Sequence, residues 1–419
     1  MRLVYLHQYF CFPDKNGGTR SYDLAKEFVA NGIAVDVITS SMSENHSKFG
    51  WSLIERDGIR VHVISLPYDN KMSFFKRKVA FVKFSWLATL KLLSLRCDLV
   101  LATSTPLTIA LPALVKKFIS GTPYIFEVRD VWPEAVIAIG AVRSKTAIFL
   151  LESLERFTYR HAAAIVALST DMRDSIVRRS NFLKDESVKV IENISEIDRF
   201  KVPVSSSKPN LKKMLGFEPR FAVLYAGAFG RVNGLRYAVD LARRFLTLDP
   251  TITFVLIGDG AEKEIVREYA CSSGVFGKNL YLLDPVPKNM LPELYAECDL
   301  GSSFVLNIPE LWANSANKFF DSLAAGRPVL INYGGWQKKV IAENLTGFAL
   351  APEIENIDEA DLVDIVEYSF NERAQTMRKR AARAIAEKKY SLQVASSNYL
   401  DIINQLGGRE ITRARARDN

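Results

Sequence analysis

The sequence predicts an α/β protein built from two doubly wound domains with parallel sheets. The chain has 419 residues, which exceeds one ordinary domain. Short runs rich in valine, isoleucine and leucine alternate with amphipathic helical patterns, as in successive β–α–β units. This alternation is interrupted at residues 201–213, KVPVSSSKPNLKK, a stretch rich in serine, proline and lysine that we interpret as a linker.

The first half predicts a domain over residues 1–200. We expect its strands at Leu3–Leu6, Ala34–Thr39, Arg60–Ile64, Leu99–Ala102, Tyr124–Val128, Ala164–Ala167 and Val188–Ile191. Helical patterns lie between them at Thr19–Ala30, Pro106–Ile119, Lys145–His161 and Thr170–Arg178. Strands that are each followed by a helix predict a parallel sheet.

The second half repeats this order over residues 214–388. Strands are expected at Ala222–Tyr225, Thr253–Ile257, Leu280–Leu283, Leu300–Val305 and Val329–Asn332, with helices at Gly234–Phe245, Glu262–Ser272, Leu291–Glu297 and Asn317–Ala325. A last helix, Leu392–Leu406, lies in a segment (389–408) that can return across the first domain, and 409–419 form a basic tail. Ligands of such sheets bind outside the carboxyl ends of the strands, so two domains face to face predict a cleft site.

Composition excludes several classes of protein. Hydrophobic residues make up 48% and charged residues 24%, values typical of globular proteins rather than of disordered or fibrous ones. The four cysteines and four histidines show no metal-binding spacing, so we expect no metal. The start of the chain resembles a strand rather than a signal peptide, and no apolar run has the length of a membrane span, so we expect a cytosolic protein. The net charge of +8 favours a phosphate-bearing or anionic lipid partner; no nucleic-acid recognition motif is present.

Two motifs of the first half carry candidate functional residues. NGGTR (16–20) follows the first strand, and Gly17 and Gly18 allow close backbone approach to a phosphate, although a simple turn explains them too. FEVRDVWPEA (126–135) places four functional side chains at the end of a strand: Arg129, Asp130, Trp132 and Glu134. There an arginine can hold a phosphate, an aspartate can orient or deprotonate a hydroxyl, and a tryptophan can stack on a sugar. The alternative is an Arg–Asp pair beneath a packed tryptophan; we favour function.

Three motifs of the second half resemble nucleotide-binding loops. In YAGAFGRVNGLRYAV (225–239), Gly227 follows a strand and Arg231 can neutralise a phosphate, but the spacing is not GxGxxG. In IGDGAE (257–262), Gly258 and Asp259 permit a tight turn near a ribose or base, which a plain turn explains equally well.

The third of these motifs is the most specific. ANSANKFFDSLAAGRPVL (313–330) begins a helix that Asn314 or Ser315 can cap. The helix dipole and Lys318 would favour a diphosphate there, and Asp321 can accept hydrogen bonds from a ribose. An ordinary capped helix is the alternative, and the FEVRDVWPE motif shifts the balance toward function.

Together these motifs resemble the family 4 glycosyltransferases, which have the GT-B fold of two Rossmann-like domains facing a cleft. The resemblance covers nearly the whole sequence and includes LYAECD (294–299). FEVRDVWPE and NSANKFFDSLAAGRPV together resemble the branch that builds bacterial O-antigen, capsule and colanic-acid-type polysaccharides, in particular its N-acetyl-L-fucosamine transferases.

The resemblance implies retaining transfer from a nucleotide-diphosphate sugar, usually a UDP-sugar, without a metal or other cofactor. The acceptor is a saccharide carried on a polyprenyl diphosphate. Gly17 and Gly18 match the loop that approaches the donor diphosphate, and Asp130 matches an aspartate near the acceptor, beside which Trp132 and Glu134 are assigned to acceptor binding. The phosphate-facing start of the cleft helix corresponds to Asn314, Ser315, Asn317 and Lys318, and the second acidic residue of the family's E-x7-E pattern to Asp321.

The sequence departs from the family pattern at several positions. The first acidic residue of E-x7-E falls on Ala313, with Glu310 close by as a candidate substitute. The usual arginine and lysine of the 225–239 loop fall on Ala228 and Asn233, where Arg231 can supply the lost charge. Arg129 stands where many relatives have a histidine.

The segment from Lys71 to Arg96 predicts contact with a membrane. It contains seven basic residues, interleaved with phenylalanine and tryptophan, and no acidic residue. A basic aromatic helix suits an anionic bilayer, where a lipid-linked acceptor would lie, so we expect peripheral binding at the inner face of the cytoplasmic membrane. A helix with one core face and one solvated face is the alternative.

Two other functions stay open at this stage. One is a non-hydrolysing sugar-nucleotide 2-epimerase on the same architecture. The other is a non-catalytic sugar-nucleotide-binding subunit of a polysaccharide assembly complex, which the substitutions at Ala313, Ala228 and Asn233 favour.

Overall fold

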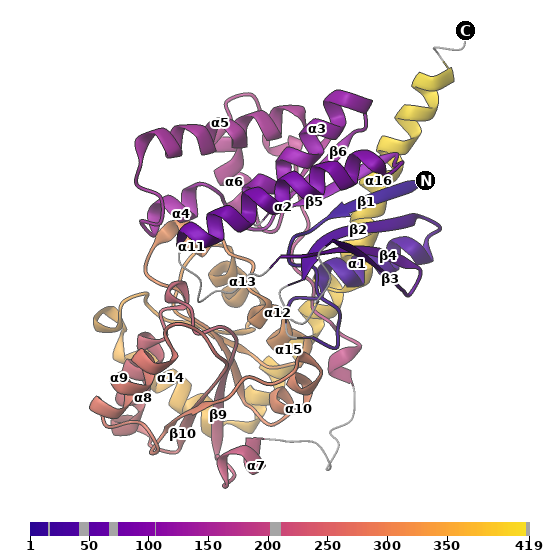
Figure 1. Cartoon of the computed structure of the whole chain (residues 1–419). Coiled ribbons are helices and arrows are strands. Elements are labelled where there is room, and N and C mark those ends of the chain that lie inside the picture. The colour runs from indigo at the N-terminus through magenta and orange to yellow at the C-terminus, as the bar shows by residue number, and fades with distance from the viewer. Residues whose placement is uncertain (16, 42–49, 67–73, 105, 202–210, 416–419) are drawn as a thin grey trace. The chain divides into compact units, whose positions relative to one another are not determined.

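The computed structural model describes residues 1–15, 17–41, 50–66, 74–104, 106–201 and 211–415 (Figure 1). The chain divides into two compact units. The first unit comprises Met1–Phe12, Gly18–Glu192 and Gln393–Asn419, and the second comprises Pro13–Gly17 and Asn193–Leu392. Residues 193–200, which the sequence placed in the first domain, therefore belong to the second unit.

The first unit contains an eight-stranded sheet with the strand order β3-β4-β2-β1-β5-β6-β7-β8. The strands are β1 (Arg2–Leu6), β2 (Ala34–Ser41), β3 (Trp51–Arg56), β4 (Ile59–Ser65), β5 (Leu99–Thr103), β6 (Tyr124–Val128), β7 (Ala164–Ala167) and β8 (Val188–Val190). All neighbours pair in parallel except β3 and β4, which form an antiparallel hairpin. The sequence did not predict β3, because its residues, WSLIER, are largely exposed and lack an apolar run.

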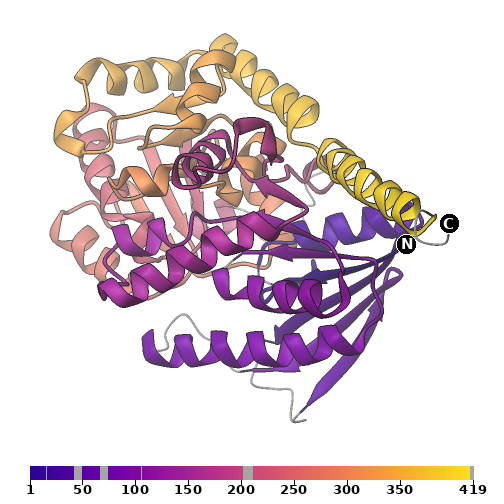
Figure 2. The ribbon, with the colours of Figure 1, turned by 90° about the horizontal axis from the view of Figure 1, so that it is seen from above.

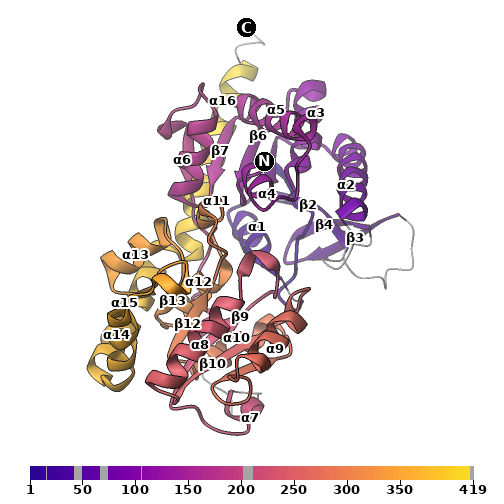
Figure 3. The ribbon, with the colours of Figure 1, turned by 90° about the vertical axis from the view of Figure 1, so that its left-hand side faces the viewer.

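Helices cover both faces of this sheet. They are α1 (Arg20–Ala30), α2 (Phe74–Ser94), α3 (Ala110–Ser120), α4 (Glu134–Ala138), α5 (Lys145–His161), α6 (Thr170–Arg179) and α16 (Leu392–Arg415). Helices α2, α3 and α5 lie side by side on one face, whereas α1 and α16 lie on the other (Figures 2 and 3). The C-terminal helix is held there by apolar packing, since the rings of Phe28 and Tyr399 are 6.1 Å apart.

The second unit contains a six-stranded, all-parallel sheet with the order β11-β10-β9-β12-β13-β14. Its strands are β9 (Phe221–Ala226), β10 (Ile252–Ile257), β11 (Leu280–Leu283), β12 (Leu300–Ser303), β13 (Val329–Ile331) and β14 (Gly347–Ala349). Its helices are α7 (Leu211–Leu215), α8 (Arg236–Leu248), α9 (Lys263–Ser272), α10 (Leu291–Ala296), α11 (Pro309–Trp312), α12 (Asn317–Ala324), α13 (Trp336–Asn344), α14 (Glu359–Phe370) and α15 (Glu372–Lys389).

The end of the predicted linker is helical. Residues 202–210 lie outside the described part of the chain, but Leu211–Lys213 form the first turn of α7. Leu211 is fully buried and packs in an apolar cluster with Leu224 and Val255, so the second unit begins before residue 214.

Candidate functional site

Two glycine loops of the second unit are joined by their backbones. Strands β9 and β10 end together, because Ala226 pairs with Ile257, so Gly227 and Gly258 follow side by side. A Cβ on Gly258 would lie 1.8 Å from the carbonyl oxygen of Gly227, and one on Gly260 would lie 2.4 Å from that of Phe229. Backbone packing therefore accounts for Gly258 and Gly260 without a ligand, whereas Gly227 has a side-chain neighbour.

That neighbour is Lys318, in the first turn of α12. A Cβ on Gly227 would lie 3.2 Å from Lys318 Cδ and Nζ, so the glycine lets the lysine lie across the loop. The ammonium group donates a hydrogen bond to Asn233 Oδ1 (3.4 Å) and lies 5.0 Å from the centre of the Tyr225 ring. The structure thus brings Gly227 and Lys318, from two separate motifs, together at the carboxyl end of the sheet.

Burial shifts the pKa values of two charged residues in α12, Lys318 and Asp321. Burial lowers the pKa of Lys318 to about 8, and the nearby Asp321 opposes the shift. Burial also raises the pKa of Asp321 to about 6, although the cation of Lys288 opposes this. Asp321 is itself 6% exposed, on the buried face of α12. A half-buried lysine with a lowered pKa gains stabilisation from any anion that enters, which is the property expected of a phosphate site.

The start of α12 differs from the predicted capped helix. The N-cap residue is Ala316, and no side chain caps the helix, so the expectation for Asn314 and Ser315 is wrong. Asn314 Oδ1 accepts from the Ala316 N–H (3.2 Å), and the Asn314 carbonyl accepts from Trp336 Nε1 (3.0 Å). Asn314 therefore shapes the turn that precedes the helix rather than its first turn.

Asn193 holds the same turn from another part of the chain. Its backbone N–H donates to Ser315 Oγ (3.4 Å) and its Nδ2 to the Ser315 carbonyl (3.2 Å). A short hydrogen bond also joins Asn193 Nδ2 to Asn317 Oδ1. Asn193 is 3% exposed and opens the long segment of the second unit. The sequence analysis missed it, because a single asparagine after a strand carries no periodic or motif signal.

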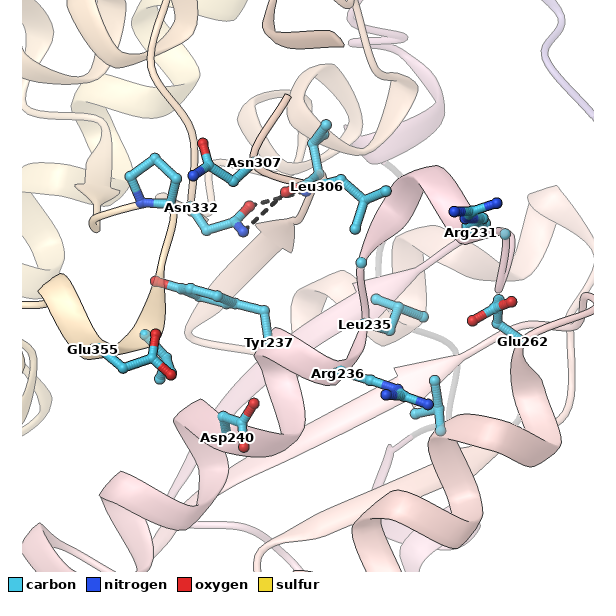
Figure 4. Close-up of a pocket in the computed structure, with 16 residues that line it drawn as sticks. Arg231, Leu235, Arg236, Tyr237, Asp240, Glu262, Leu306, Asn307, Asn332 and Glu355 are labelled. Carbon is cyan, nitrogen blue, oxygen red and sulfur yellow. Dashed lines mark hydrogen bonds between the residues drawn. The ribbon is translucent and has the colours of Figure 1, made fainter. Parts of the chain in front are cut away.

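A pocket of about 450 Å³ lies beside the 225–239 loop (Figure 4). Arg231, of the predicted donor residues, lines it, whereas Lys318 and Asp321 do not. Several polar groups at its wall already have partners: Asn332 exchanges hydrogen bonds with the backbone of Val305 (2.9 and 3.0 Å), and Tyr237 donates to the Ala351 carbonyl (2.7 Å). The pocket therefore offers few unengaged groups besides its charged rim.

Two predicted acidic residues of the second unit are exposed. Asp259 lies at the tip of the loop after β10, where its carbonyl accepts from the Phe229 N–H (2.9 Å). Glu310 lies on the short helix α11, and Ala313, at the first position of the acidic pattern, is 8% exposed.

In the first unit, Arg129 lies at the carboxyl end of β6. Its Nη1 is 3.4 Å from His7 Nε2, its Nε is 4.0 Å from Glu127 Oε1, and its backbone N–H donates to Ser104 Oγ (2.9 Å). Burial, and then the charge of Arg129, hold the pKa of His7 well below its usual range. His7 is therefore neutral and accepts the hydrogen bond from Arg129. The carboxylate beside Arg129 is Glu127, while Asp130 is exposed in the following turn.

Glu127 is the centre of a buried polar network that the sequence analysis did not single out. The residue is fully buried, accepts from Thr103 Oγ1 (2.8 Å) and through a short bond from the Tyr399 hydroxyl of α16, and lies 3.6 Å from Arg20 Nε. Burial alone would raise the pKa of Glu127, but Arg20 and Arg129 hold it below its usual value. A charged residue inside the apolar strand YIFEV was the available signal.

Arg20 ties this network to the end of the unit. Its Nη1 donates to the Glu192 carbonyl (2.6 Å) and its Nη2 to the Ile191 carbonyl (3.1 Å). Arg20 is the last residue of the early glycine motif, in which Gly17 is exposed with φ +148° and Gly18 is half-buried. Thr19 is the N-cap residue of α1, without a side-chain cap bond.

The two predicted acceptor residues of the first unit have different surroundings. Glu134 Oε1 accepts from Arg178 Nη2 (3.1 Å), and its other oxygen accepts a short bond from Ser175, so its carboxylate ties α4 to α6. Trp132 is half-buried, and its backbone N–H donates to the Asp130 carbonyl (2.9 Å).

The described residues include neither a metal-binding cluster nor a membrane-spanning helix. They contain no group of three or more histidine, cysteine, aspartate or glutamate residues placed to hold a metal ion. None of their helices combines the length and apolar character needed to cross a bilayer.

Comparison with known proteins identifies both halves of the chain. Residues 17–193 match the family model "Glycosyl transferase 4-like domain", and residues 220–368 match "Glycosyl transferases group 1". A relative from Pseudomonas aeruginosa, "Probable glycosyltransferase WbjE", is 25% identical over an alignment of 320 residues that covers 71% of this chain and 75% of that protein.

Solved structures share the fold over almost the full length. Sucrose-phosphate synthase from Thermosynechococcus elongatus is 15% identical with a TM-score of 0.75, covering 97% of this chain and 99% of that chain. Anabaena Alr3699/HepE in complex with UDP and glucose is 18% identical with a TM-score of 0.68, covering 97% of this chain and 100% of that chain. The chain, which joins a glycosyl transferase 4-like domain to a group 1 domain, is therefore a glycosyltransferase with the GT-B fold.

Proposed function

We propose that this glycosyltransferase moves a sugar from a UDP-sugar to a lipid-linked saccharide, with retention, during synthesis of a bacterial surface polysaccharide such as O-antigen or capsule. The observation that carries the proposal is Lys318, a half-buried cation lying across Gly227 at the carboxyl end of the second sheet. HepE, of the same fold, has been solved with UDP and with UDP-glucose, which supports a uridine diphosphate donor.

The finer assignment of substrates rests on the sequence motifs. Because FEVRDVWPE and NSANKFFDSLAAGRPV resemble segments of N-acetyl-L-fucosamine transferases, we propose an N-acetylated hexosamine such as N-acetyl-L-fucosamine as the donor sugar and a polyprenyl-diphosphate-linked acceptor. The relative WbjE is described as a probable glycosyltransferase, and this description names neither a donor sugar nor an acceptor. The enzyme would act at the inner face of the cytoplasmic membrane, contacting anionic lipid through the Lys71–Arg96 segment. Lys71 lies outside the described residues, and α2 carries most of the rest.

The proposed chemistry places positive charge where negative charge develops. As the bond between the anomeric carbon and the phosphate oxygen breaks, that oxygen gains charge, and the Lys318 ammonium stabilises it more than the ground state. The acceptor hydroxyl attacks from the face that the diphosphate leaves, and its proton passes to the departing phosphate oxygen. We assign no covalent nucleophile, and cations of the protein take the place of a metal.

In the first unit, we propose that Arg129, Asp130 and Trp132 form the acceptor side. The ring of Trp132 would stack on a sugar, and Asp130 would orient the attacking hydroxyl. Arg129 is held by His7 and Glu127, so its direction is fixed before any ligand enters.

A donor screen tests the proposal. The protein is incubated with several UDP-sugars and lipid-diphosphate acceptors, and the products are identified by mass spectrometry. A product that gains the mass of one sugar residue and depends on Lys318 is the expected result. Conversion of a UDP-sugar without acceptor would indicate an epimerase, and UDP binding by calorimetry without transfer to any acceptor would indicate a non-catalytic subunit.

A further inference from the structure

The layer of helices α2, α3 and α5 exposes large apolar side chains to an unusual degree. Seven such side chains among the described residues are at least 58% exposed, and six of them lie on this layer: Val82, Trp86, Phe118, Ile119, Phe149 and Leu150. The seventh, Phe370, lies in the second unit. Scattered apolar residues are normal on a protein surface, but a contiguous set on one layer marks an interaction site.

Aromatic contacts join two of these three neighbouring helices. Helix α3 packs between α2 and α5, as the first unit shows in Figures 1 and 2. Phe118 of α3 stacks on Phe157 of α5 with ring centres 5.8 Å apart, and the His161 ring lies 4.2 Å from that of Phe157. These contacts form an aromatic seam between the two helices, and Phe157 is itself 44% exposed.

The same layer is strongly basic. Its three helices contain ten lysine and arginine residues and two glutamates, Glu152 and Glu155. Both glutamates pair with Arg179 of α6, at 3.8 and 2.8 Å. The excess of eight positive charges equals the net charge of the whole chain, +8, so the rest of the protein is neutral on balance.

The combination of exposed apolar side chains and positive charge on α2, α3 and α5 favours one kind of binding partner over others. A second copy of the chain would bring two layers of the same charge together, which is unfavourable at low salt. A nucleic acid would use the cations but not aliphatic side chains such as Val82, Ile119 and Leu150. An anionic bilayer uses both, because lysine and arginine contact the headgroups while apolar side chains enter the interface.

We propose that the outer surface of α2, α3 and α5, rather than the Lys71–Arg96 segment alone, is the membrane-docking face of the protein, with Trp86, Phe118 and Phe149 inserted among anionic lipids. The inference rests on the proposed function in one respect, since a lipid-linked acceptor gives the protein its reason to bind a membrane. It adds helices α3 and α5, to which the sequence analysis assigned no function.

Vesicle sedimentation tests the docking face. The full chain is mixed with phosphatidylglycerol–phosphatidylcholine vesicles or with pure phosphatidylcholine vesicles at low and high salt. We expect binding to the anionic vesicles that weakens with salt, and at least tenfold weaker binding for Phe149→Ser and for Trp86→Ser. Phe370→Ser, which removes an equally exposed ring from the second unit, is the matched control and should bind as the wild type does.

Three results would overturn the inference. The first is that both folded variants bind anionic vesicles as strongly as the wild type does. The second is that the wild type binds zwitterionic and anionic vesicles equally well at all salt concentrations, and the third is a concentration-dependent dimer of the wild type that either substitution abolishes. Thermal unfolding shows that the variants are folded. Transfer by the wild-type protein to a soluble acceptor, measured without vesicles, separates the two proposals. Vesicle binding without any transfer would count against the proposed function. Transfer without vesicle binding would count against the docking face.

Discussion

Replacing Lys318 by alanine removes the cation that we assign to the donor diphosphate. A hydrogen bond to a charged group contributes about 1.5–3 kcal/mol, so we expect kcat/KM for the donor to fall roughly ten- to a hundredfold. The loss should be chiefly in turnover, because charge on the leaving diphosphate increases in the transition state. The side chain packs over Gly227 and Tyr225 without filling the core, so the fold should persist.

Because the pKa of Lys318 is lowered, its role should also make UDP binding depend on pH. Burial lowers this pKa to about 8 in the free protein, so about half of the lysine is uncharged at pH 8 and about a tenth at pH 7. A bound diphosphate favours the charged form and raises the pKa. UDP binding should therefore take up about half a proton at pH 8, and affinity should fall as pH rises above that value. Lys318→Arg keeps its charge and should abolish this alkaline decline.

Calorimetry with UDP in two buffers of different ionisation enthalpy measures the proton uptake directly. Steady-state kinetics of Lys318→Ala and Lys318→Arg from pH 6.5 to about 9 complete the test over the range set by the lysine. Lys212→Ala is a control, because Lys212 is an exposed lysine of the same unit, paired with Glu218 at 2.8 Å. A folded Lys318→Ala protein with kcat/KM within twofold of wild type, or UDP binding without proton uptake at pH 8, would refute the assignment.

Three further substitutions test contacts that support the two sheets. Asn193→Ala removes the side-chain bonds to the Ser315 carbonyl and to Asn317 Oδ1 but keeps the backbone bond to Ser315 Oγ. We expect the donor KM to rise roughly tenfold with a nearly unchanged melting temperature, measured by steady-state kinetics and circular dichroism. Glu127→Gln removes the carboxylate that pairs with the buried Arg20 and should lower the free energy of unfolding, measured in urea, by about 3–5 kcal/mol. In the wild type, the ion pair stabilises the fold fully above the pKa of an unfolded glutamate. This stabilisation is lost as the pH falls through the lowered pKa of Glu127 in the folded protein. Gly258→Ala should lose several kcal/mol because its Cβ would meet a carbonyl at 1.8 Å, whereas Gly274→Ala, with φ +71° and open space, should lose about 1 kcal/mol.

The sequence predicted the features whose signals are local. Strands such as Leu280–Leu283 and helices such as Lys145–His161 have the predicted bounds, because buried parallel strands and amphipathic helices leave an apolar pattern in consecutive residues. The sequence also predicted the turns after β9 and β10 and the helix that begins at Asn317, since turns and helix starts have short motifs. Strand β3 was missed because an exposed edge hairpin has no apolar pattern to detect.

The supporting residues of the site could not be found in the same way. Asn193 and the Ser315 carbonyl to which it donates are 122 positions apart in the sequence. Tyr399 and Glu127, which share a hydrogen bond, are 272 positions apart. The caps assigned to Asn314 and Ser315 were wrong because Asn314 Oδ1 accepts from the Ala316 N–H and Ser315 Oγ accepts from the Asn193 N–H instead. Such roles arise from packing between segments, and a single sequence contains no record of that packing.

The charges of the first unit bear on our proposal that Arg129 contacts a substrate, because a carboxylate lies beside it. The buried network contains one carboxylate, Glu127, and two guanidinium groups, Arg20 and Arg129, while His7 is neutral. Arg20 is the closer of the two, 3.6 Å against 4.0 Å, and its donors are also engaged by backbone carbonyls. One positive charge is thus left in excess, and it resides mainly on Arg129, whose side chain is 17% exposed whereas that of Arg20 is 2% exposed. Each unit therefore has a partly buried cation near the carboxyl end of its sheet, and these two cations support the proposal that the protein acts on anionic groups.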